Sequence, residues 1–177
     1  LPVSEVVELG CYHHYDQLTA RQRRNRVNHY LELLELTAFK DRSFTTLSGG
    51  EKKRVLLAKC LLQLDDDGKR ETNNTRYLLL DEPTAAPDVE QQYRFVHLAT
   101  GLARERGMGV LAVLHDLNLA ARFADDLVLL RDGRVSSAGP TIDVLTKANI
   151  RAAFDVDCLI QQHPHFEGPL ITTLPYE

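Results

Sequence analysis

A serine, two glycines and a glutamate in succession form the first chemically informative stretch. Residues 47–51 read LSGGE, the form of a capping box, in which the Ser48 hydroxyl accepts from the Glu51 backbone N–H and the Glu51 carboxylate reaches back. A cap alone does not require Gly49 and Gly50, each of which costs roughly 1 kcal/mol in a helix relative to Ala. Glycines there let an anion approach bare N–H groups at the positive end of the helix dipole. The stretch therefore predicts a helix start that binds phosphate.

Two adjacent carboxylates end the second stretch. Residues 77–84 read YLLLDEPT, an apolar run that we expect to be a buried strand, followed by Asp81, Glu82 and Pro83. Ligands in open α/β sheets bind outside the carboxyl ends of the strands. We expect Asp81 to hold Mg²⁺, directly or through water, and Glu82 to act as general base on an attacking water. A pair of surface acids before a turn is the alternative interpretation.

A histidine follows the next apolar run. His115 comes directly after residues 110–114, which read VLAVL. A single histidine at a strand end is usually a hydrogen-bonded core or surface residue, so its type alone indicates no function. Its place one strand after the two carboxylates makes it a candidate site residue. Asp116 is interpreted as the N-cap of the helix that follows.

Hydrophobic periodicity predicts three helices before the first strand. They cover residues 1–9, 19–36 and 48–64, with Ser4, Thr19 and Ser48 as N-caps. We find no strand pattern before Arg76, so residues 1–64 are expected to form a helical subdomain that ends in the LSGGE helix. Residues 65–75 are polar and contain glycine, as is typical of a surface loop.

From residue 76 onward strands alternate with helices. We expect strands at 77–80, 109–114 and 127–130, helices at 88–106 and 116–124, and a hairpin turn at Asp132-Gly133. This alternation predicts an α/β fold with a parallel-sheet core over residues 76–139. Two short helices within residues 140–154 and a terminal hairpin of 157–162 with 170–174 complete a small C-terminal α/β segment over residues 140–177.

Composition limits the class of protein. The 177 residues are 44% hydrophobic and 26% charged, which is ordinary for a soluble domain with a core. A net charge of -4 argues against nucleic acid as the main partner, because phosphate binding needs clustered Lys and Arg. The basic run at residues 21–26 is interpreted as a solvated helix face, with nucleic-acid binding as the alternative. No apolar run approaches the roughly 18–20 residues of a membrane span.

Together, LSGGE, YLLLDEPT and the later His115 resemble the signature motif, the Walker B motif and the switch histidine of ATP-binding cassette (ABC) ATPases. The resemblance covers most of the chain and implies a P-loop NTPase fold with ATP and Mg²⁺ as cofactors. It implies that Ser48, Gly49 and Gly50, with Glu51 in the same motif, contact ATP held by a second copy of the subunit. A homodimer with two shared sites follows from that arrangement.

The same resemblance implies roles for two further residues. His115 would hydrogen-bond the γ-phosphate, and Asp88 would be the aspartate of the D-loop, which links the two sites. The D-loop departs from the common SALD, because this chain has AAPD at residues 85–88. Asp88 also fits a capping pattern with Gln91 for the next helix. A second departure is Lys52 and Lys53 where glutamine is common, which strengthens nucleotide attraction or belongs to a solvated helix face.

The phosphate-binding P-loop of these ATPases has no counterpart in the sequence. No GxxxxGK[ST] string occurs, so we expect the chain to be the C-terminal part of a longer ATPase and to be inactive alone. Residues 110–140 and the DVLT at 143–146 resemble importers of iron-siderophores, haem and cobalamin. The segment at 65–75 and the ending from residue 154 are most similar to haem-importer ATPases.

The resemblance to importers implies the setting in which the chain works. Two transmembrane permease subunits and, indirectly, a periplasmic binding protein would be its partners, on the cytoplasmic face of the bacterial inner membrane. Two alternatives stay open. One is a soluble ABC ATPase of DNA repair, although the sequence lacks the sustained heptads typical of those proteins. The other is a non-catalytic subunit, which the altered D-loop suggests.

Overall fold

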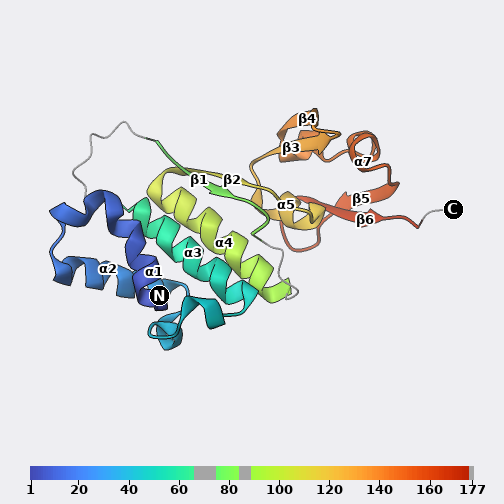
Figure 1. Cartoon of the computed structure of the whole chain (residues 1–177). Coiled ribbons are helices and arrows are strands. Elements are labelled where there is room, and N and C mark those ends of the chain that lie inside the picture. The colour runs from blue at the N-terminus through green and yellow to red at the C-terminus, as the bar shows by residue number, and fades with distance from the viewer. Residues whose placement is uncertain (66–74, 84–88, 176–177) are drawn as a thin grey trace.

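The computed structural model describes residues 1–65, 75–83 and 89–175. Figure 1 shows helices α1, α2 and α3 at one end of the molecule, together with the N-terminus, and strands β3 to β6 with the C-terminus at the other end. Strands β1 and β2 run between these ends. Within the described residues the strands form three separate two-stranded sheets, β1-β2, β3-β4 and β5-β6.

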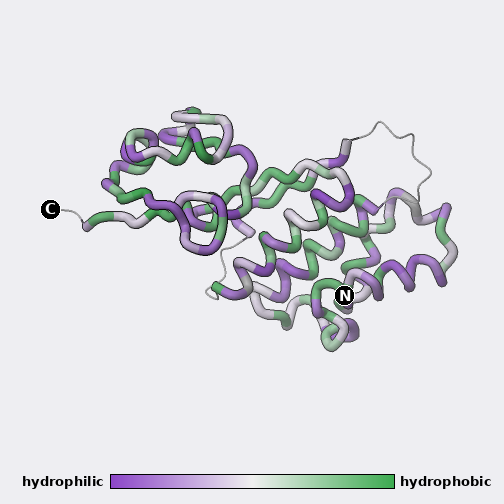
Figure 2. The backbone as a smooth tube through the Cα atoms, turned by 180° about the vertical axis from the view of Figure 1, so that it is seen from behind, coloured by the Kyte–Doolittle hydropathy of each residue, from purple (hydrophilic) through white to green (hydrophobic). Residues whose placement is uncertain are grey.

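The helical end is built from α1 (Val3–Glu8), α2 (Ala20–Leu33) and α3 (Gly49–Gln63), with 3-10 turns at Leu9–Gln17, Thr37–Phe39 and Phe44–Thr46. Thr19 caps α2, as the sequence predicts, and it does so through a capping box with Gln22. The expected apolar positions of α2 are also buried: Val27, Tyr30, Leu31 and Leu34. Figure 2 shows α2 as a mostly hydrophilic helix, which fits a single buried stripe on an otherwise solvated element.

The first helix starts differently from the prediction. Ser4 was expected as its N-cap, but α1 begins at Val3, Pro2 occupies the cap position, and no side chain caps the helix. Backbone contacts replace the cap, because the Val3 and Ser4 N–H groups donate to the carbonyls of Arg42 and Lys40. A side-chain cap is unnecessary where the chain itself satisfies the first N–H groups.

Strands β1 (Arg76–Leu80) and β2 (Met108–Ala112) pair in parallel, with Leu78 opposite Val110 and Leu80 opposite Ala112. Helix α4 (Val89–Arg106) connects them, the β–α–β order typical of a parallel pair. The prediction of a buried strand is right for one face only. Leu78 is 3% exposed and belongs to the core of the helical end, whereas Leu79 is 71% exposed. Side chains alternate along a strand, so one face of β1 packs on the helices and the other faces solvent.

The C-terminal end contains the predicted elements. Helix α5 (Leu117–Phe123) is capped by Asp116, and β3 (Asp126–Arg131) turns into β4 (Arg134–Pro140) at Asp132-Gly133, both with positive φ. Helices α6 (Thr141–Val144) and α7 (Lys147–Phe154) follow. Strands β5 (Cys158–Gln162) and β6 (Pro169–Thr173) form the terminal hairpin. Among the strands of the described residues, β1 and β2 pair in parallel and the other two pairs are antiparallel.

The two largest hydrophobic cores of the described residues cross the predicted boundaries between subdomains. The larger contains buried residues of α1, α2 and α3 together with Leu78 of β1, Leu102 of α4 and Met108 of β2. The smaller joins Ala121 of α5 to residues of the C-terminal segment. No helix in the described parts of the chain is long and apolar enough to cross a membrane.

Candidate functional site

The LSGGE stretch forms the N-terminus of α3. Ser48 is the N-cap, its hydroxyl accepting from the Glu51 N–H at 3.3 Å, and the Glu51 carboxylate accepts from the Ser48 N–H at 2.7 Å. The hydrogen bond that the Ser48 backbone N–H donates to the carboxylate, followed by a side-chain hydrogen bond from Ser48, lowers the pKa of the Glu51 carboxyl, because each favours its charged form. The capping box is therefore present, and Ser48, Gly49 and Gly50 are all exposed at this helix end.

The packing of the chain does not explain the two glycines. A Cβ built at Gly49 or at Gly50 meets no atom of the described residues within 4 Å, and neither residue has a positive φ. The contrast is Gly10, where a Cβ would lie 2.4 Å from the Lys59 carbonyl oxygen of α3. Gly10 is required by close packing inside the chain, whereas Gly49 and Gly50 leave open room at a helix N-terminus.

The parallel pairing of β1 and β2 brings a carboxylate that follows β1 close to His115, which follows β2. The Val113 N–H donates to the Leu80 carbonyl at 2.9 Å, which continues the β1–β2 pairing just beyond the strands. Two residues further on, His115 Nε2 lies 2.9 Å from Glu82 Oε1. The side chains are 70% and 50% exposed, so a ligand could reach both. The structure thus places two of the predicted residues in direct contact.

The backbone of Glu82 is unusual for its residue type. Its φ is +44°, in the left-handed region that costs a non-glycine residue about 1–2 kcal/mol. The residue before a proline is restricted as well, and Pro83 follows. Such strain persists only where surrounding contacts over-determine the conformation, and it gathers at functional sites.

One of these contacts comes from a residue whose role the sequence left open. Lys53 of α3 donates from Nζ to the Glu82 backbone carbonyl at 2.6 Å. The two residues are 29 positions apart in the sequence. The sequence singled out Lys53 as extra positive charge after LSGGE, but this contact depends on how α3 packs against the end of β1, which no local pattern reveals.

The remaining predicted site residues are placed as follows. Asp81 is exposed directly after β1. Its hard carboxylate oxygens fit Mg²⁺, which proteins usually hold through one or two carboxylates together with phosphate oxygens. Asp88 lies outside the described residues, as do the other D-loop positions 85–87. Within the described residues, no three His, Cys, Asp or Glu side chains gather as a metal-binding group.

One arginine of the basic run on α2 makes contacts within the chain. Arg23 donates from Nε to Glu8 at 3.0 Å and from Nη1 to the Leu18 carbonyl at 2.7 Å, and it stacks over the Tyr15 ring at 3.8 Å. Its side chain is only 13% exposed. This arginine connects α2 to the preceding turn, so the interpretation of the run as a solvated helix face is wrong for Arg23.

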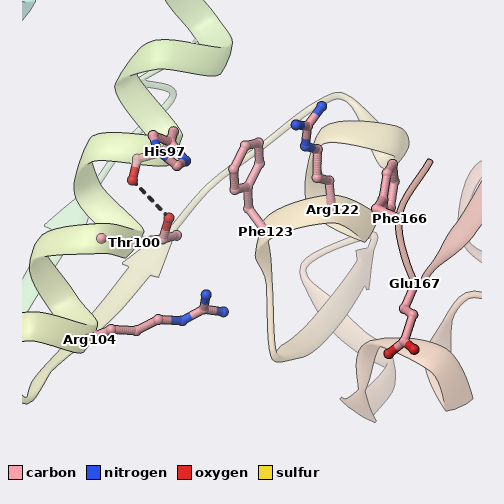
Figure 3. Close-up of a pocket in the computed structure, with 8 residues that line it drawn as sticks. His97, Thr100, Arg104, Arg122, Phe123, Phe166 and Glu167 are labelled. Carbon is pink, nitrogen blue, oxygen red and sulfur yellow. Dashed lines mark hydrogen bonds between the residues drawn. The ribbon is translucent and has the colours of Figure 1, made fainter.

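A pocket of about 270 Å³ lies away from these residues, between α4 and α5. Figure 3 shows His97, Thr100 and Arg104 on the α4 side and Phe123, Arg122 and Phe166 opposite. None of the predicted site residues lines it. The Arg122 guanidinium lies 5.3–5.5 Å from the rings of Tyr93, Phe123 and Phe166, so aromatic contacts hold it in place.

Comparison with known proteins defines the class. Residues 3–85 match the family model described as ABC transporter. This match covers the N-terminal part of the chain, and together with the parallel β1–β2 pair and the helical end it supports a partial ABC ATPase.

The most informative relatives are importer subunits. The chain is 39% identical over 97% of its length to the Hemin import ATP-binding protein HmuV of Bordetella parapertussis, covering 64% of that protein. It is 44% identical over 86% of its length to the HmuV of Burkholderia ambifaria, covering 56%. The chain is also 39% identical over 98% of its length to the Cobalamin import ATP-binding protein BtuD of Halobacterium salinarum, and it covers 41% of that protein.

Solved structures support the fold. A metal-chelate type ABC transporter in an inward-facing conformation matches all of this chain and 68% of its own, with a TM-score of 0.78 and 26% identity. A dimeric ATP-binding cassette bound to ADP and Pi matches 80% of this chain and 57% of its own, with a TM-score of 0.68 and 29% identity. The chain spans less than two thirds of the length of the first curated relatives.

Proposed function

We propose that this chain is the catalytic and signature part of an ATP-binding subunit that hydrolyses ATP to drive an ABC importer. The observation that carries the proposal is the contact between Glu82 and His115 at the ends of two parallel strands. In this role the subunit works together with a P-loop segment of the GxxxxGK[ST] type. The P-loop-containing form is the protein that has this sequence together with that segment.

Each residue has a defined task in the proposed reaction. Glu82 accepts a proton from the water that attacks the γ-phosphate, and its side chain is half exposed, so that this water can reach the carboxylate. His115 donates a hydrogen bond to the γ-phosphate. Asp81 holds the Mg²⁺ that neutralises charge on the phosphates. Asp88 links the two sites of the dimer.

The open helix end of α3 supports a dimer. Ser48, Gly49 and Gly50 present N–H groups and a hydroxyl that can surround the γ-phosphate of ATP bound to a second copy, with Glu51 holding the serine in place. The room around the two glycines supports this role, because no described residue of the same chain occupies it. Each site is complete only when two subunits meet.

The relatives support haem as the imported molecule. Several of them are named hemin import proteins, and a relative named for cobalamin import is the reason to keep cobalamin as an alternative, with iron-siderophores beside it. The partners are then two permease subunits in the membrane and, through them, a periplasmic binding protein. The subunit would be bound peripherally at the cytoplasmic face of the inner membrane. No nucleic acid is required.

Replacing the proposed base tests this function. In the P-loop-containing form, Glu82→Gln is expected to lower ATP turnover by about 10²–10⁴-fold, the usual contribution of a general base, and to trap an ATP-bound dimer. Phosphate release measures turnover and size-exclusion chromatography with ATP measures the dimer. Lys59→Met is the control, since Lys59 lies further along α3. The chain of 177 residues alone is expected to be inactive. Near-normal hydrolysis by Glu82→Gln contradicts the proposal.

Two other functions make different predictions. A soluble DNA-repair ATPase would bind DNA in a salt-dependent manner, which a fluorescence titration of the P-loop-containing form against duplex DNA measures. A non-catalytic subunit would bind ATP without turning it over, even with its permease partners present. Turnover in the assembled transporter that is lost in Glu82→Gln excludes both.

A further inference from the structure

Lys53 is a residue whose contact the proposed function does not use. It lies on α3, one turn after the exposed glycines, and its ammonium donates to the Glu82 carbonyl at 2.6 Å. Lysine is an excellent donor but loses considerable side-chain freedom when it is held in one geometry. A lysine that spans two elements to reach one carbonyl therefore indicates that the position of that carbonyl matters.

The carbonyl in question belongs to the most constrained residue of the site. Glu82 has a φ of +44° and precedes a proline, so the backbone on both sides of its Cα is restricted. Rotation of this backbone would swing the carboxylate away from its place beside His115. Two contacts hold the residue from opposite ends: Lys53 at the carbonyl and His115 at the carboxylate.

We propose that Lys53 is a positioning residue for Glu82, which fixes the peptide after Glu82 so that the carboxylate faces His115 and the attacking water. The proposal rests on the proposed function, because it assumes that Glu82 is the general base. It also means that the helix whose start serves the ATP of the partner subunit is attached to the base of its own subunit. A shift of α3 would then move Glu82.

Substitutions at Lys53 separate the donor from the bulk of the side chain. Lys53→Met keeps the length of the stem and removes the donor, whereas Lys53→Arg keeps a cationic donor. Lys59→Met is the matched control, since Lys59 lies on the same helix and is half-buried like Lys53, and the described part of the structure records no polar contact of its side chain. Thermal unfolding of each variant checks that the fold is kept.

The first measurement uses the 177-residue chain without nucleotide. The imidazole ¹⁵N–¹H correlations of His115 report whether Glu82 is beside it, and Glu82→Gln supplies the reference for a lost contact. We expect Lys53→Met to shift the His115 resonances toward the Glu82→Gln positions, and Lys53→Arg and Lys59→Met to leave them in place. Wild-type resonances in Lys53→Met overturn the proposal, as does a Glu82→Gln spectrum identical to wild type.

The second measurement uses the P-loop-containing form. Lys53→Met is expected to lower kcat by about 10–100-fold, comparable to a 1 Å misplacement of a catalytic group, with the KM for ATP unchanged. Lys53→Arg should recover most of the turnover. If Glu82→Gln is inactive but Lys53→Met turns over like wild type, the positioning role is wrong while the proposed function stands. If Glu82→Gln remains active, the proposed function fails, and the resonance shifts then report a structural contact only.

Discussion

The helical end of the molecule and the β1–β2 pair differ in how much of their apolar surface is buried within the chain. In the helical end, the large side chains Tyr30, Leu31 and Leu61 are no more than 1% exposed. On the outer face of β1 and β2, Tyr77, Leu79 and Leu111 are 65–71% exposed although they are equally apolar. The chain's own packing explains these large side chains of the first region and leaves those of the second unexplained, beside the strand ends that Glu82 and His115 follow.

The two regions also differ in how polar groups are used. Arg106 of α4 donates to the Tyr30 hydroxyl at 2.6 Å inside the helical end, where burial raises the pKa of the Tyr30 phenol. At the end of β1, the polar contacts of Glu82 are exposed and accompany a strained backbone. The buried contact stabilises the fold, whereas the exposed contacts hold the proposed general base at a cost in stability. Regions of this second kind are where function is expected.

Truncation of a leucine in each region should give the largest difference. Leu61→Ala is expected to lower the free energy of unfolding by about 2–5 kcal/mol, because it leaves a cavity in a closed core. Leu79→Ala should change it by less than about 0.5 kcal/mol, as for other exposed sites. Urea unfolding followed by circular dichroism measures both. A similar large loss in Leu79→Ala would show that the outer face of β1 is covered in solution, and the contrast between the regions would disappear.

Alanine at two kinds of glycine should give a smaller difference of opposite sign. Gly10→Ala forces a Cβ against the Lys59 carbonyl and should destabilise the chain by about 1–3 kcal/mol, as overpacking does. Gly50→Ala meets no neighbour and should stabilise it by about 0.5–1 kcal/mol through helix propensity. Thermal unfolding of both variants measures this difference.

ATP turnover tests whether the open room at Gly50 serves function. In the P-loop-containing form, Gly50→Ala should lower ATP turnover despite the gain in stability, because the added methyl group occupies the room proposed for the partner's γ-phosphate. A Gly50→Ala protein that is both more stable and fully active would mean that the two glycines serve neither packing nor phosphate.

The sequence predicted the elements well and the site only in part. Periodicity and capping located α2, α3 and the hairpin of β3 and β4, because those signals are local. The contact of Glu82 with His115 was foreseeable in outline, since consecutive parallel strands end at the same edge. The Lys53 contact and the left-handed Glu82 depend on packing between elements far apart in the sequence, and no local pattern encodes them. Asp88 stays a prediction.

The smallest expected effect is a pH dependence at the start of α3. The pKa of Glu51 is lowered in the folded chain by its hydrogen bonds with Ser48, so the unfolded chain binds a proton at higher pH than the folded one. This contribution to stability is fully present above the ordinary carboxyl pKa, about 4.3 for Glu, and is lost as pH falls through the lower folded value. It adds to the favourable interaction of a carboxylate with a helix N-terminus.

Glu51→Gln isolates that charge, because glutamine can also complete a capping box. At pH 7 the wild-type chain should be more stable than Glu51→Gln by about 0.3–1 kcal/mol, and this difference should vanish below the folded pKa of Glu51. Urea unfolding of both chains from pH 3 to pH 7 measures the difference. A gap that is constant with pH would show that the carboxylate charge is not what Glu51 contributes. The helix start would then be held by hydrogen-bond geometry alone, and Glu51 would add no negative charge beside the proposed phosphate site.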